Sequence, residues 1–132
     1  MARKHEVQAQ GNDQTRARQE REAQDRLLAL GADALDPRPW RPAPVPPTAV
    51  DLTQFALWRS ADLDPADLLS VLTLLPAARA EVDGVESGLL FTARAAGLTW
   101  AQIAEAMGFR SPQACQQHFV RLADRQADQS WA

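Results

Sequence analysis

The sequence has 132 residues and holds a single cysteine, Cys115, which excludes an internal disulfide and is typical of a reducing cytoplasm. Only two histidines, His5 and His118, accompany it, and they show no metal-ligand spacing, so we expect no metal site. The sequence also lacks a glycine-rich phosphate loop and a nucleophile paired with a base. We therefore expect neither an enzyme nor a bound cofactor.

Long hydrophobic runs are missing as well. No stretch of 18 or more apolar residues is present, so we expect no transmembrane helix. The polar segment Met1 to Gln10 has no hydrophobic centre and does not resemble a signal peptide, which indicates a cytoplasmic protein. Alternating apolar and polar patterns typical of strands are also absent, so the predicted fold class is all-α.

Charge is distributed unevenly along the chain. The overall formal charge of −3 does not by itself favour a nucleic-acid partner. From Thr48 to Glu86, however, two arginines face seven acids, a net charge of −5. From Ser87 to Arg125, four arginines face two acids, a net charge of +2. A polyanionic partner would therefore contact the C-terminal part of the chain.

The composition predicts three parts. Residues 1–35 are rich in Gln, Arg and Glu and form a polar arm, either partly helical and solvated or in contact with phosphates or a partner protein. Residues 36–47 contain six prolines and form an extended, semi-rigid linker, with a proline-rich peptide ligand as the alternative. Residues 48–132 carry most of the large apolar side chains and form the helical domain. We expect the arm and linker to be dispensable for its folding.

The helical domain begins with two predicted segments. The first, from Asp51 to Ser60, places Leu52, Phe55 and Ala56 inward, with Trp58 as a further candidate. The second starts at Asp64 as N-cap with Pro65 at the first helical position, and Pro76 ends or kinks it. Further apolar residues then recur at helical spacing up to Ala96, so the predicted architecture is a small helical bundle.

A short helix follows, with strong signals at both ends. Gly97 occupies the position where a helix C-terminus favours a left-handed residue. Thr99 and Gln102 have the spacing of a capping box. Gly108 ends the short helix, because a turn there requires a positive φ.

A second helix starts directly after this turn. Ser111 is its predicted N-cap and Pro112 its first residue. Cys115, Phe119 and Leu122 share one face, which we expect to be buried. Two capped helices joined by a tight glycine turn are the pattern of a helix-turn-helix, which we place at about residues 85–125.

The opposite face of the second helix is polar and is the candidate DNA-binding surface. Glutamine can bond adenine through two edge atoms, and arginine suits phosphates, so the segment predicts double-stranded DNA as partner. The predicted DNA-binding residues are Arg110, Ser111, Gln113, Gln116, Gln117 and Arg121.

The segment GLTWAQIAEAMGFRSPQACQQHFVRL resembles small actinobacterial helix-turn-helix DNA-binding proteins, some described as heat-shock transcriptional regulators, and also the promoter-reading end (region 4) of sigma factors. The similarity extends over about residues 68–122 and implies a tri-helical DNA-binding fold. Ala104, Gly108, Phe109 and Ala114 match the small, turn, plug and packing positions. Gln117 departs from the pattern, because many such motifs are apolar there, and we expect Phe119 to pack instead.

These observations predict a DNA-binding transcriptional regulator associated with the nucleoid. The alternative is a helical protein–protein adaptor that acts on the transcription machinery without touching DNA. We also expect a homodimer, because the segment from Asp64 to Leu75 is apolar around much of its circumference. Leu68, Val71 and Leu74 would form its interface, unless Phe55 and Trp58 cover this surface within the chain.

Overall fold

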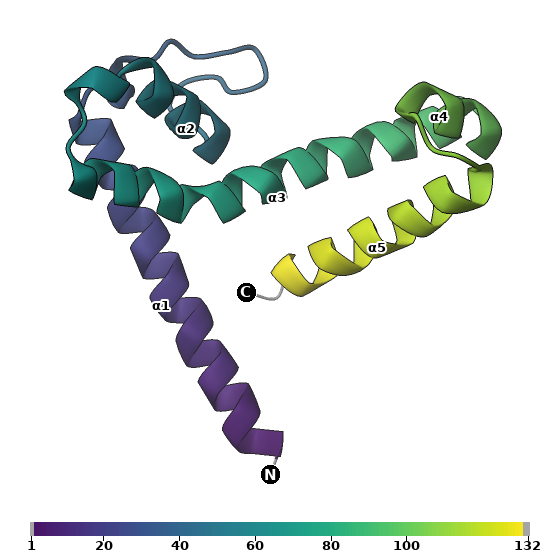
Figure 1. Cartoon of the computed structure of the whole chain (residues 1–132), viewed down its shortest axis with the longest axis horizontal. Coiled ribbons are helices and arrows are strands. Elements are labelled where there is room, and N and C mark those ends of the chain that lie inside the picture. The colour runs from purple at the N-terminus through teal and green to yellow at the C-terminus, as the bar shows by residue number, and fades with distance from the viewer. Residues whose placement is uncertain (1, 131–132) are drawn as a thin grey trace. The chain divides into compact units, whose positions relative to one another are not determined.

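The computed structural model describes residues 2–130, and in that range the protein is all-α, as predicted (Figure 1). It contains five α-helices, two single-turn 3₁₀ helices and no strand, apart from an isolated bridge between Arg38 and Arg41. The elements are α1 (Ala2–Ala29), η1 (Ala32–Ala34), α2 (Ala49–Trp58), η2 (Ser60–Asp62), α3 (Pro65–Ala95), α4 (Trp100–Met107) and α5 (Pro112–Ser130). None of the helices between residues 2 and 130 is long and apolar enough to cross a membrane.

The chain divides into two compact units, residues 1–81 and 82–132, which we call unit 1 and unit 2. Helix α3 contributes residues to both. The sequence instead places the start of the helical domain at residue 48. That domain assignment stays a prediction, and each unit is described by itself below.

Unit 1 has its own apolar core, to which the end of α1 contributes. Ala23 and Leu27, one helical turn apart, are buried together with residues of η1, α2 and α3. Leu52, Phe55 and Ala56 of α2 are confirmed as inward, whereas the further candidate Trp58 is wrong, since it is 77% exposed. The buried members of this core are Ala23, Leu27, Ala32, Leu52, Phe55, Ala56 and Leu74. The arm is therefore not polar throughout, because its last two turns carry apolar residues at a spacing that puts them on one face.

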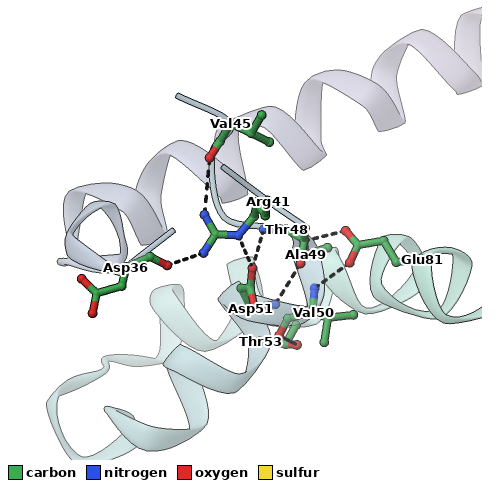
Figure 2. Close-up of polar contacts among 9 residues, drawn as sticks. All are labelled: Asp36, Arg41, Val45, Thr48, Ala49, Val50, Asp51, Thr53 and Glu81. Carbon is green, nitrogen blue, oxygen red and sulfur yellow. Dashed lines mark hydrogen bonds and ion pairs between the residues drawn. The ribbon is translucent and has the colours of Figure 1, made fainter. Parts of the chain in front are cut away.

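The proline-rich segment is not the extended spacer that the sequence predicts, because Arg38 and Arg41 pair across a tight turn and Val45 N donates to Pro42 O. Side-chain contacts fix the segment to unit 1 (Figure 2). Arg41 is only 6% exposed. Its guanidinium donates to the carbonyl oxygens of Asp36, at 2.8 Å, and Val45, at 3.4 Å. Its Nε lies 3.0 Å from Oδ2 of Asp51, an ion pair without hydrogen-bond geometry. One buried arginine thus joins both ends of the segment to α2.

The N-terminus of α2 has all of its first amide groups satisfied. Thr48 and Asp51 form a capping box, with Asp51 N donating to Thr48 Oγ1 and Thr48 N donating to Asp51 Oδ2. The carboxylate of Glu81, from α3, accepts from Ala49 N at 2.7 Å and from Val50 N at 3.1 Å (Figure 2). Two carboxylates therefore lie at the positive end of the helix dipole.

The start of α3 is capped as predicted and also bound by α1. Asp64 Oδ1 accepts from Asp67 N, and Pro65 is the first helical residue. The Asp67 carboxylate accepts from Arg26 Nε at 2.7 Å and from Asp64 N at 3.0 Å. The Arg26 side chain, followed by the Asp64 amide, lowers the pKa of Asp67 below its ordinary value of 3.8, and burial opposes them. Asp67 is therefore an ionised link between two helices.

The predicted dimer interface on α3 is wrong in one of its three residues. Leu74 is only 3% exposed, because it is part of the unit 1 core. Val71 also packs against this core, whereas Leu68 is exposed. Pro76 lies inside α3 and does not end it. The apolar circumference of this segment is thus covered in part within unit 1 itself.

Candidate nucleic-acid interface

The entry to α4 is built by local signals in unit 2. Helix α3 ends at Ala95 and is followed by a turn in which Gly97 has a φ of +92°. The next amide, Leu98 N, donates back to Ala93 O of the helix. Thr99 Oγ1 then accepts from Gln102 N at 3.1 Å, and Gln102 Oε1 accepts from Thr99 N at 2.8 Å. The predicted glycine stop and capping box are both confirmed.

The turn between α4 and α5 depends on Gly108. Its φ of +82° and ψ of +19° lie in the left-handed region. Gly108 N donates to Glu105 O, and Phe109 N donates to Ala104 O at 2.8 Å. These two bonds form a Schellman motif, which reverses the chain immediately after α4. Phe109 packs against the core of unit 2.

Helix α5 begins as expected and packs on the other two helices. Ser111 Oγ accepts from Ala114 N at 3.1 Å, which makes Ser111 the N-cap. Cys115 and Leu122 are fully buried, and Phe119 is partly buried beside them. The buried core of unit 2 consists of Leu90, Ile103, Ala104, Cys115 and Leu122.

Ring contacts and one polar side-chain contact fix the orientation of α5 further. Trp100 of α4 lies 5.7 Å from Phe119, measured between ring centroids. His118 lies 5.1 Å from Phe109, and its Nε2 is 3.1 Å from Oε1 of Glu86 on α3. His118 is therefore a half-buried packing residue between α3 and the start of α5.

Cys115 is a core residue and not a reactive one. Burial, followed by the nearby Glu86 carboxylate, raises the pKa of its thiol above the ordinary value of 9.0. The thiol is therefore uncharged at neutral pH, and thiols are poor nucleophiles in that form. Among residues 2–130, no group of three or more His, Cys, Asp or Glu side chains could hold a metal ion.

The outer face of α5 brings most of the predicted DNA-binding residues together. Gln113, Gln116, Gln117 and Arg121 are exposed, and together with Val120 they line one shallow hollow. The exposed state of Gln117 and the packing of Phe119 fix the register of the helix. Val120 is a member that the predicted site did not include, although its i+7 spacing from Gln113 places it on that face.

The two remaining predicted residues lie at the N-terminal end of α5. Arg110 is exposed, and Ser111 is partly buried with its hydroxyl oxygen used in the cap. Within the described residues, Arg110 and Arg121 make no ion pair, whereas Arg125 lies 3.9 Å from Asp83. Asp124, one turn beyond Val120, is an exposed acid. The exposed face of α5 on which no described acid pairs with the arginines therefore extends from Arg110 to Arg121.

One comparison with known proteins gives a match. Residues 89–132, one third of the chain, match the family model of the Myb-like DNA-binding domain. This segment contains the end of α3, all of α4 and the described part of α5, so the match supports a DNA-binding role of the helix-turn-helix type. No curated protein and no solved structure matches the chain.

Proposed function

We propose that this protein is a DNA-binding transcriptional regulator that inserts α5 into the major groove. The observation that carries the proposal is the outer face of α5, a polar surface on a helix that a glycine turn and two caps hold against α4. A major groove about 12 Å wide accepts such a helix. The family match of residues 89–132 independently supports DNA as the partner.

Each residue of the face has a proposed role. Gln113 and Gln117, one helical turn apart, bond base edges, with Gln116 beside them. Arg110 and Arg121, at opposite ends of the face, bond phosphates and fix the register of the helix on the duplex. Ser111, at the N-terminus of α5, lies where backbone amides and the helix dipole favour a phosphate.

Electrophoretic retardation of genomic DNA fragments by the full chain at low salt tests the proposal. On a selected fragment, we expect the double variant Gln113→Ala/Gln117→Ala to lose about 1–3 kcal/mol per bidentate contact and nonspecific binding to fall less. The double variant Arg110→Ala/Arg121→Ala should weaken binding to all sequences. It should also reduce the slope of log affinity against log salt by about 0.9 per lost phosphate contact.

Matched controls come from unit 1. Gln14 on α1 and Arg79 on α3 are exposed, and their alanine variants should bind DNA as the unchanged protein does. A folded protein that retards no genomic fragment would contradict direct DNA binding. Equal losses from Gln14→Ala and from the glutamines of α5 would contradict the assigned face.

A role as an adaptor that contacts the transcription machinery is favoured by exposed large apolar side chains of unit 1. Trp40, Leu57 and Trp58 are all highly exposed, Trp40 at 82%. Exposed tryptophan is common at the centres of protein interfaces. Chromatin pull-down with sequencing, run beside mass spectrometry of co-purified proteins, separates the two functions. Enriched DNA sites support direct DNA binding, and protein partners without enriched sites support the adaptor.

A further inference from the structure

Unit 2 contains an apolar groove between α3 and α4. The groove is lined by exposed apolar side chains, chiefly Val82, Val85, Leu89, Leu98 and Met107, with the core residues Leu90 and Ile103 at its base. Only two lining residues are polar, Glu86 and Gln102. Val85 and Leu89 are 62% and 64% exposed, although exposed apolar residues on monomeric proteins are usually scattered singly.

The α3 side of the groove has the spacing of a helix-pairing surface. Val82, Val85 and Leu89 are separated by three and four residues, as the a and d positions of a heptad are. These three side chains are not part of the buried core of unit 2, to which α3 contributes Leu90, with Ala93 packed beside it. Helix α3 thus presents a second apolar stripe that no described residue of unit 2 covers.

The charge of the groove distinguishes between possible occupants. Its one charged lining residue, Glu86, is already paired with His118, and Gln102 is engaged in the cap of α4. A partner with charged side chains would leave them unpaired in this groove, at a large cost in desolvation. A second copy of the same groove brings apolar surface against apolar surface, as the self-complementary interface of a two-fold dimer requires.

We infer that two copies of this chain pair through the groove formed by Val82, Val85, Leu89, Leu98 and Met107. The interface includes no residue of α5, so the proposed DNA-binding face stays free in the dimer. A dimer also carries two copies of α5, so that two weakly basic DNA-binding faces can bind one duplex together. The inference goes beyond the proposed function and does not depend on it, because association is measured without DNA.

Light scattering after size exclusion of the full chain, from roughly 1 to 100 µM, tests the pairing. We expect the mass to rise with concentration to twice the 14.5 kDa of one chain. Val85→Glu and Leu89→Glu should each weaken association roughly tenfold or more, since the two-fold axis places the new carboxylates near each other in apolar surroundings. Phe91→Glu is the matched control, because Phe91 is 73% exposed on the same helix but does not line the groove.

Circular dichroism of each variant shows that it is folded. Leu89→Ala, which introduces no charge, replaces any variant that fails this test and should also weaken association. A monomer over the whole range would overturn the inference, and so would a dimer that the groove variants leave intact. A monomer in which Leu89→Glu lowers the melting temperature and Phe91→Glu does not would show that the chain itself covers the groove, which also overturns it.

Discussion

Both units have an apolar core, but unit 1 also buries two charged side chains, Arg41 and Asp67, whereas no charged residue of unit 2 is buried among the described residues. The polar contacts between helices of unit 2, His118 with Glu86 and Arg125 with Asp83, are more exposed. The Arg26–Asp67 pair connects residues 41 apart, and Glu81 accepts from amides of α2 more than 30 residues away. The buried core of unit 2 contains no charged residue, and its helices end at Gly97 and Gly108 with positive φ. Unit 1 is therefore the part more sensitive to the loss of a single charge.

The difference also concerns the surfaces that each unit leaves for partners. The five acids of unit 1 between Thr48 and Glu81 are all used inside it, at helix N-termini or beside arginines. In unit 2 the arginines at the ends of the α5 face, Arg110 and Arg121, have no ion-pair partner among the described residues. Paired charges stabilise a fold, and unpaired charges on an exposed face are available to a ligand.

Removal of the buried guanidinium of Arg41 should give the largest difference in stability between the two units. In Arg41→Ala, the carbonyl groups of Asp36 and Val45 and the carboxylate of Asp51 lose their partner, which should cost about 3–5 kcal/mol in the stability of unit 1. Hydrogen exchange followed by mass spectrometry reports the two units separately. We expect faster exchange throughout residues 2–81 and little change in 82–130.

The matched control for this variant is Arg38→Ala. Arg38 belongs to the same proline-rich segment, but its side chain is exposed. Exchange in unit 1 should therefore stay close to that of the unchanged protein. Equal effects of the two substitutions would show that the Arg41 side chain does not join the segment to α2. Equally faster exchange in residues 82–130 of Arg41→Ala would show that the two units are not independent.

The sequence predicts unit 2 in detail, because the relevant interactions are local. A capping box joins residues three apart, and a glycine stop needs only the backbone of one residue, so Thr99, Gly108 and Ser111 could be assigned from their neighbours. The exposed face of α5 then follows from the helical period. The same helical period places Val120 on this face, although it is apolar and is not one of the predicted DNA-binding residues.

The contacts of unit 1 could not be predicted in this way. Nothing near Arg41 in the sequence indicates that its guanidinium is buried, and nothing near Glu81 indicates that it caps α2. Such pairs depend on the tertiary packing that brings distant segments together. The same reason explains the error at Leu74, since an apolar residue on a wide apolar helix faces a partner chain or its own core with the same pattern.

A smaller effect in unit 2 should follow from substitution of its turn glycine. In Gly108→Ala, a Cβ would meet no atom within 4 Å, so the cost comes from the φ of +82° alone, about 1–2 kcal/mol. Gly88→Ala is the matched control, because Gly88 lies inside α3 with equally open surroundings. There the substitution should stabilise the helix by about 0.5–1 kcal/mol. Thermal unfolding followed by circular dichroism should show opposite shifts, and shifts of the same sign would contradict the role of the Gly108 turn.

The smallest expected effect is a pH dependence confined to unit 1. Because the pKa of Asp67 is lowered in the folded state by Arg26 and the Asp64 amide, its stabilisation is complete above the unfolded value near 3.8 and is lost as the pH falls through the folded value below it. As the pH falls below about 4, hydrogen exchange should therefore show a progressive loss of protection in residues 2–81. Asp67→Asn should weaken unit 1 at neutral pH and make it less dependent on pH in this window. Asp62→Asn is the control, since Asp62 pairs with Arg59 at the surface and its exposed ion pair should contribute little. If the unchanged protein and Asp67→Asn lose protection in parallel as the pH falls, Asp67 is not the carboxylate that links α1 to α3.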